Sequence, residues 1–236
     1  MIVDMHTHIV YGVDDGAKDL DMSRAMLKRA AENGVQVICC TSHSTPGHAA
    51  FPWDDYLAHL EVMGQVILEE KLPLTLLTGS EILYTDDAAD MARRGDIPTL
   101  AGKNAVLVEF LPITDWGQIT RAAREFSTRG LQMVCAHVER YHCLHEDMDR
   151  LYELKEEYGV ILQMNCSTIL RAGGLMGDKF AKKALKAGLI DIAASDAHNV
   201  TERACNIGQC RTFLQKHYGE ETARRLLEDT PQSILF

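Results

Sequence analysis

Residues 34–43, Gly-Val-Gln-Val-Ile-Cys-Cys-Thr-Ser-His, contain the unit that decides the fold of this chain. The glycine at its start ends an amphipathic helical pattern over Asp19–Glu32, which has acidic residues in its first turn. The next six residues are apolar enough for a strand that is buried on both faces. That strand places His43 at its carboxyl end.

The same order of helix, glycine, apolar run and polar residue recurs along the chain. Further helices are predicted at 53–70, 86–94, 116–128, 146–158 and 178–187. The apolar residues 1–3 lead into an extended strand that carries His6 and His8, and further strands are predicted at 74–77, 105–108, 131–135, 160–164 and 189–193. The remainder, from Glu202 onward, is predicted to be helical except near Pro231. The sequence therefore predicts seven strand-helix units.

A repeated unit of this kind favours an α/β fold with a parallel barrel, in which the carboxyl ends of all strands share one face. A doubly wound open sheet is the main alternative. It concentrates ligands at one switch point, and this chain has neither G-x-G-x-x-G nor a P-loop. Because the 236 residues contain no linker or low-complexity segment, we expect a single domain over 1–236.

The composition excludes several classes of protein. Hydrophobic residues at 46% and charged residues at 25% are typical of a soluble globular protein. The net charge of −10 argues against a nucleic-acid binder. Asp4 and His6 interrupt the first apolar residues, so no secretory signal is predicted, and no apolar run approaches the roughly 18 residues of a membrane span. We expect a cytoplasmic protein that is not inserted in a membrane, and the oligomeric state stays open.

Polar residues at the predicted strand ends form a candidate metal site. His6 and His8 stand two residues apart, so an extended strand turns both imidazoles to one side, and the turn Asp14-Asp15-Gly16 can fold back over them. A polar residue at a single strand end is more often a solvated loop residue. The prediction therefore rests on the recurrence of such residues at the ends of successive strands. The candidate ligands are His6, His8, Asp15, His43, Glu81, Glu109, His137, Asp196 and His198.

Five imidazoles and four carboxylates without a thiolate suit manganese, iron, zinc or cobalt. Nine ligands exceed the need of one ion; two ions leave ligands to spare, and three share them with Glu81 or Glu109 as a bridge. Divalent ions would also attract a phosphate dianion to this acidic chain. Because metal-bound water ionises near neutral pH, the pattern predicts hydrolysis of a phosphoester by a metal-bound hydroxide, without a covalent intermediate.

The motifs around these residues resemble those of the PHP (polymerase and histidinol phosphatase) superfamily. The matching motifs are His6-Thr7-His8, Asp14-Asp15-Gly16, Thr41-Ser42-His43, Gly79-Ser80-Glu81-Ile82, Val108-Glu109-Phe110, His137-Val138-Glu139-Arg140-Tyr141 and Ser195-Asp196-Ala197-His198-Asn199. Within the superfamily, the chain is most similar to bacterial protein-tyrosine phosphatases encoded in capsule and exopolysaccharide loci.

This resemblance implies a distorted TIM-like (β/α)7 barrel with three metal ions, usually manganese, held by the nine residues named above. It implies Arg140 and Arg203 as the residues that hold the phosphate, a role suited to the bidentate donors of a guanidinium. It also implies the substrate, which is phosphotyrosine in the C-terminal tail of a cognate bacterial tyrosine kinase. Removal of that phosphate would regulate capsular or exopolysaccharide synthesis.

Other functions remain open. The chain could be a PHP phosphoesterase that acts on histidinol phosphate or a nucleotide, or a non-catalytic binding module with a structural metal. A different mechanism, with a cysteine nucleophile, is suggested by residues Cys205–Arg211, which match the C-x5-R motif of cysteine-dependent phosphatases. This match lies in a predicted helix over 202–216, with no strand before it to present a phosphate-binding loop, so we interpret it as chance.

Overall fold

Seven parallel strands form the centre of the computed structural model, which describes residues 1–173 and 178–236. Each strand pairs with the next one in the sequence, so spatial order and chain order are the same. The strands are β1 (Val3–Thr7), β2 (Val37–Ser44), β3 (Thr75–Leu83), β4 (Ala105–Glu109), β5 (Gln132–Cys135), β6 (Ile161–Asn165) and β7 (Ile192–Ala194).

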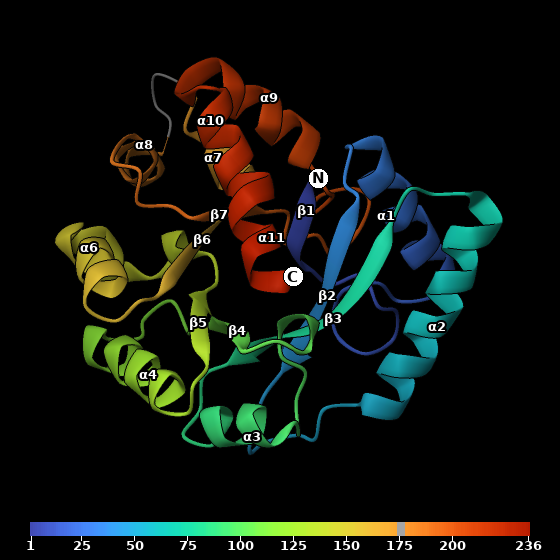
Figure 1. Cartoon of the computed structure of the whole chain (residues 1–236), viewed down its shortest axis with the longest axis horizontal. Coiled ribbons are helices and arrows are strands. Elements are labelled where there is room, and N and C mark those ends of the chain that lie inside the picture. Colours follow the sequence, from blue (N-terminus) through green and yellow to red (C-terminus); the bar gives the residue numbers. More distant parts are fainter. Residues whose placement is uncertain (174–177) are drawn as a thin grey trace.

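Helices surround this sheet, most of them in an outer ring (Figure 1). They are α1 (Leu20–Glu32), α2 (Trp53–Glu70), α3 (Ala88–Arg94), α4 (Trp116–Thr128), α5 (His142–Glu146), α6 (Asp149–Glu156), α7 (Cys166–Arg171), α8 (Lys179–Lys186), α9 (Ile207–Tyr218), α10 (Glu220–Arg224) and α11 (Thr230–Leu235). Aspartates cap three of them: the side chains of Asp19, Asp115 and Asp178 accept hydrogen bonds from backbone N–H groups in the first turns of α1, α4 and α8.

The barrel closes between β1 and the segment that follows β7. Thr7 and Ala197 form a parallel bridge, and the backbone N–H of Asp196 donates to the carbonyl of His6 at 2.8 Å. Below this bridge, the Ser195 hydroxyl and backbone N–H both donate to the buried carboxyl of Asp4. The closure therefore brings the two ends of the chain's strand series together beside His6.

The opposite end of the barrel is covered by the C-terminal helix. α11 lies over the middle of the helix ring in Figure 1, and Leu235 packs with Val3, Met5 and Val37 in the apolar cluster inside the barrel. A second apolar layer fills the space between the sheet and the outer helices. With this end filled, the carboxyl ends of the strands remain as the face that can hold a site.

The prediction of a (β/α)7 barrel is confirmed, whereas several predicted boundaries are wrong. The helix predicted over 202–216 begins only at Ile207, and the short helices α5 and α7 were not predicted. Pro231 was expected to interrupt the C-terminal helix but lies in the first turn of α11, which continues directly from the π-helical segment Arg225–Asp229. Among the described residues, no helix is both long and apolar enough to cross a membrane.

Candidate metal centre

All nine candidate ligands lie at the carboxyl ends of the strands, and the barrel brings them together. His6 is in β1 and His8 follows it, His43 is near the end of β2, Glu81 is in β3 and Glu109 ends β4. His137 follows β5, and Asp196 and His198 follow β7. Eight of the side chains form three groups whose candidate ligand atoms lie within 4.8 Å of one another, and His137 lies beside the group that contains Glu81 and Glu109.

The first group is fully buried and consists of His6, His8, Glu81 and Asp196. The Nε2 atoms of the two histidines are 3.2 Å apart. Each of them lies 3.2 Å from Oε2 of Glu81, and 3.4 or 3.5 Å from Oδ1 of Asp196. Two imidazoles and two carboxylates thus converge on one point, which is a donor set that suits a first-row divalent metal.

The second group consists of His43, Glu81 and Glu109, with His137 beside it. Nε2 of His137 is 2.7 Å from Oε1 of Glu81 and 3.8 Å from Oε2 of Glu109. Nδ1 of His43 lies 3.1 Å from Oε1 of Glu109 and 3.2 Å from Oε2 of Glu81. Since Glu81 faces both the first and the second group, its two oxygens are placed to bridge them.

The third group includes Asp15, His43 and His198, with His8 behind them. Oδ1 of Asp15 lies 3.4 Å from Nε2 of His43 and 3.4 Å from Nε2 of His198. Asp15 is 65% exposed, so this group is at the mouth of the site. Within the described part of the chain, the buried Nε2 of His198 has no hydrogen-bond partner. A buried nitrogen with a free lone pair fits a metal ligand.

The Nδ1 atoms of four histidines face oxygen acceptors, which leaves Nε2 of each ring as the ligand atom. His6 faces the side-chain carbonyl of Gln163 at 3.2 Å, His8 faces Asp14 at 2.9 Å, and His43 faces Glu109 at 3.1 Å. Nδ1 of His198 faces the backbone carbonyl of Asp196 at 3.0 Å. Because these oxygens only accept, Nδ1 carries the proton and Nε2 carries the lone pair. The residues present therefore fit bound metal ions.

Burial and charge shift the pKa values of these groups in opposite directions. Burial lowers the pKa of His6 and His8, but the carboxylates of Glu81 and Asp196, with Asp14 beside His8, outweigh it and raise both pKa values. Burial likewise raises the pKa of Asp196, but the nearby His6 and His8 bring it below its usual range. The raised pKa values favour protonation of these imidazoles, so protons and metal ions compete for the same nitrogen atoms.

The turn after β1 is fixed tightly against His8. One oxygen of Asp14 accepts hydrogen bonds from Nδ1 of His8 at 2.9 Å and from the backbone N–H of His43 at 3.0 Å. The other accepts from the backbone N–H of Gly16 at 2.9 Å. A Cβ atom at Gly16 would lie only 2.1 Å from the carbonyl oxygen of His8, so this position requires glycine. Asp14 therefore orients two candidate ligands, His8 and His43, although it is not itself among the site residues predicted from the sequence.

Strand β6 also contributes to the site, through residues that are not among the candidate ligands predicted from the sequence. Gln163 is buried, and its side-chain carbonyl accepts from the backbone N–H of His137 at 2.7 Å while it also faces His6. Its amide donates to Asn165 at 2.9 Å, and the Asn165 amide donates to Asp196 at 2.8 Å. The available signal was a glutamine inside an otherwise apolar strand.

Arg140 and Arg203 meet at Asp196, although they come from different loops. The Arg140 guanidinium is hydrogen-bonded to Oδ2 of Asp196, and that of Arg203 reaches the same carboxylate at 3.0 and 3.1 Å. Both side chains are 40% exposed, so their other N–H groups remain open to solvent. Asp196 therefore anchors two cations at the rim of the candidate metal centre.

The backbone around the site is strained. His137 and Asp196 have positive φ values of 31° and 52° without being glycine. Residues rarely adopt this region, and such strain is concentrated at functional sites. One residue separates each of them from the end of the preceding strand, so the strained positions lie at the barrel mouth.

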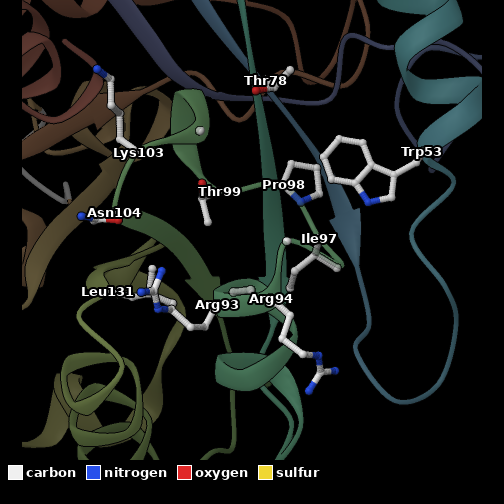
Figure 2. Close-up of a pocket in the computed structure, with 13 residues that line it drawn as sticks. Trp53, Thr78, Arg93, Arg94, Ile97, Pro98, Thr99, Lys103, Asn104 and Leu131 are labelled. Carbon is white, nitrogen blue, oxygen red and sulfur yellow. The ribbon is translucent and has the colours of Figure 1, made fainter.

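Two other features lie outside the metal centre. A cavity of about 330 Å³ between α2, α3 and the segment before β4 is lined by Trp53, Thr99 and Lys103 among others, and Figure 2 shows that its labelled residues include none of the nine candidate ligands. Cys205 of the C-x5-R match is buried before the start of α9, and burial raises the pKa of its thiol to about 12. A protonated, buried thiol is not a nucleophile.

Comparison with known proteins places the chain in a family. The family model for capsular polysaccharide synthesis proteins, CpsB/CapC, matches residues 2–236. The chain belongs to this family. It is 32% identical to the tyrosine-protein phosphatase CpsB of Streptococcus agalactiae over 240 residues, which cover 99% of this chain and 98% of that protein. It is 28% identical to the tyrosine-protein phosphatase YwqE of Bacillus subtilis, over 97% of this chain and 89% of YwqE.

The fold of a CpsB/CapC protein is also known from crystallography. A chain from the crystal structures of YwqE from Bacillus subtilis and CpsB from Streptococcus pneumoniae, described as unique metal-dependent tyrosine phosphatases, matches with a TM-score of 0.89 and 26% identity. The match covers 99% of this chain and 94% of that chain. The resemblance to the capsule-locus phosphatases, inferred from the motifs, is therefore confirmed.

Proposed function

We propose that this protein is a metal-dependent tyrosine-protein phosphatase that hydrolyses phosphotyrosine in a protein substrate. The observation that carries this proposal is the convergence of nine imidazole and carboxylate side chains, with two arginines at their rim, at the mouth of the barrel. The named relatives in the CpsB/CapC family are tyrosine-protein phosphatases, and the matching crystal structure is of a metal-dependent one.

We further propose three divalent ions, with manganese first and iron, zinc or cobalt as alternatives. A neutral imidazole has one free lone pair, so each histidine serves one ion. His6, His8, Glu81 and Asp196 would hold the first ion, and Glu81, Glu109 and His137 the second. Asp15, His43 and His198 would hold the third, because Nδ1 of His43 donates to Glu109 and leaves Nε2 facing Asp15.

When bound, such ions supply Lewis-acid chemistry and lower the pKa of water to near neutrality. Side chains of the protein would provide phosphate binding and charge balance. The solvent-facing N–H groups of Arg140 and Arg203 bind phosphate oxygens, and Asp196 keeps both guanidiniums in place. These cations also balance charge as the tyrosinate leaves, since its free pKa is near 10.

The natural substrate that we propose is phosphotyrosine in the tail of a cognate bacterial tyrosine kinase, in the cytoplasm. Two points support it. The family is one of capsular polysaccharide synthesis, and its named members act as tyrosine-protein phosphatases. Dephosphorylation of the kinase would then regulate capsular or exopolysaccharide synthesis.

A substrate panel tests the proposal. A phosphotyrosyl peptide, histidinol phosphate and a nucleotide are each incubated with the protein, with added manganese and after chelation. We expect hydrolysis of the peptide above all, loss of that activity on chelation, and recovery when manganese is returned. Peptide hydrolysis that survives complete chelation would refute the metal mechanism. A preference for histidinol phosphate or the nucleotide would assign the protein to a different phosphoesterase class.

A further inference from the structure

We propose that the loop after β4 and the groove beside it bind apolar side chains next to the phosphotyrosine in the substrate protein. This inference rests on the proposed phosphatase function and concerns its specificity. The loop begins directly after the candidate ligand Glu109 and contains Leu111, Pro112 and Ile113, all of which are exposed. Leu111 is 57% and Ile113 is 79% exposed. A run of exposed apolar residues is unfavourable in solution unless it contacts a partner.

Hydrogen bonds hold this loop in a fixed shape. The backbone N–H of Thr114 donates to the carbonyl of Leu111 at 2.9 Å, which forms a turn, and the N–H of His142 donates to the carbonyl of Pro112 at 3.0 Å. A peptide-binding loop that is already ordered loses less conformational entropy on binding. The exposed side chains are therefore presented on a preorganised support.

The root of the loop is connected to the metal centre. The backbone N–H of Phe110 donates to the hydroxyl of Tyr141 at 3.1 Å, and the same hydroxyl lies 3.2 Å from Nδ1 of His137. Tyr141 is buried and follows Arg140 in the sequence. The loop thus lies between the segment that carries Glu109 and the segment that carries both His137 and the phosphate-binding arginine.

A groove with a volume of about 500 Å³ lies between the loop after β4, with the start of α4, and the residues of α5. Ile113 and Trp116 form one wall, and His142 and Cys143 form the other. Arg150 spans the floor: its guanidinium lies 5.6 Å from the Trp116 ring and donates to the carbonyl of Cys143 at 2.7 Å. The two sides of the groove are therefore held together, and its lining is about equally polar and apolar. The exposed apolar surface lies on the loop itself, at Leu111 and Ile113.

The occupant that fits this surface is the substrate chain itself. A phosphotyrosine at the metal centre continues into peptide on both sides, and two or three extended residues reach roughly 7–10 Å. The loop starts at the metal centre, so those neighbouring residues pass over it. Since acidic and basic residues both line the groove, apolar contact rather than charge would provide the selectivity.

Three substrates and two variants test the proposal. The substrates are p-nitrophenyl phosphate, a phosphotyrosyl peptide with leucines on both sides of the phosphotyrosine, and the same peptide with serines there. The test variant is the double substitution Leu111→Ser, Ile113→Ser. The control is Leu68→Ser on the outer face of α2, where the side chain is 71% exposed at the other end of that helix from the barrel mouth.

We expect the double variant to lose about tenfold in kcat/KM for the leucine peptide, because apolar subsite contacts discriminate by factors of this order. Its kcat/KM for p-nitrophenyl phosphate and for the serine peptide should stay within about twofold of wild type, and the control variant should match wild type on all three. An unchanged rate on the leucine peptide would overturn the inference, as would an equal loss on every substrate. A lower molecular mass of the double variant in sedimentation would instead assign the loop to an interface between copies. Failure of the wild-type protein to hydrolyse any substrate would reject the phosphatase function itself.

Discussion

A single methyl group at Gly16 tests whether the turn after β1 builds part of the metal centre. In Gly16→Ala, the new Cβ would lie 2.1 Å from the carbonyl oxygen and 2.5 Å from the Cβ of His8. Non-bonded carbon atoms prefer separations of about 3.5–4.0 Å, so the backbone must move by roughly 1 Å or more. Gly16 has no positive φ, and the effect would come from this contact alone.

The turn is the part that has to move. His8 is held on both sides of its ring, by Asp14 at 2.9 Å and by Glu81 at 3.2 Å, whereas Asp15 is 65% exposed. Displacement of Asp15 by about 1 Å should lower kcat/KM about 100-fold. The overlap should also destabilise the protein by about 1–3 kcal/mol, which lowers Tm by about 2–4 °C for each kcal/mol in a chain of this size.

The assay combines kcat/KM on a phosphotyrosyl peptide, metal content by mass spectrometry and thermal unfolding. Gly64→Ala in α2 is the matched control, because its new Cβ would meet no atom within 4 Å. It should leave kcat/KM unchanged and stabilise the protein by about 0.5–1 kcal/mol, as expected for alanine in a helix interior. If Gly16→Ala keeps wild-type activity, metal content and Tm, the turn is not held against His8 and the reasoning fails.

Three further substitutions separate the roles proposed above. Asp15→Ala should lower turnover about 100-fold and remove one metal equivalent while the ion beside His6 stays bound; full activity in that variant would reduce the site to two ions. Asn165→Ala removes the amide that donates to Asp196 at 2.8 Å, and manganese affinity measured by calorimetry should fall about 10- to 100-fold. Cys205→Ser should keep wild-type kcat/KM. Because burial raises the pKa of Cys205 to about 12, folded protein keeps this proton while the unfolded chain loses it near pH 8.5, so wild type should lose stability above about pH 9. Denaturation at pH 8 and pH 10 should show a smaller loss in Cys205→Ser.

The strands and their end residues were predictable because a strand that is buried on both faces has a short, almost continuous run of apolar residues. Runs such as 131–135 have no polar residue that a helix could turn to solvent except Gln132, and the structure places β5 at Gln132–Cys135. Once the strands are parallel neighbours, the residues after them share a face. The pattern therefore assigns His43 and Glu81 to one site although they are far apart in the sequence.

Helix starts and the closing contacts of the barrel were less accessible. The sequence pattern predicts a helix from Glu202, whereas residues 202–206 form an irregular segment in which Cys205 is buried, and the helix begins at Ile207. No local sequence signal marks this helix start, because the segment is positioned by contacts with residues that are distant in the sequence. The backbone N–H of Gly208, for example, donates to the side chain of Asn33, which lies at the end of α1. Likewise the bridge between Thr7 and Ala197 joins residues 190 positions apart. Such tertiary contacts override local preference.

The acceptors behind the histidines explain why residue type alone does not define this site. An imidazole can offer either nitrogen to a metal, and the choice depends on where its other nitrogen finds an acceptor. For His6 that acceptor is Gln163 on β6, the one strand of the seven that ends without a candidate ligand. For His8 it is Asp14, six residues along the chain. The sequence shows the ligand types at the strand ends, while the barrel supplies the acceptors from other segments, so β6 belongs to the site as fully as the strands that carry ligands.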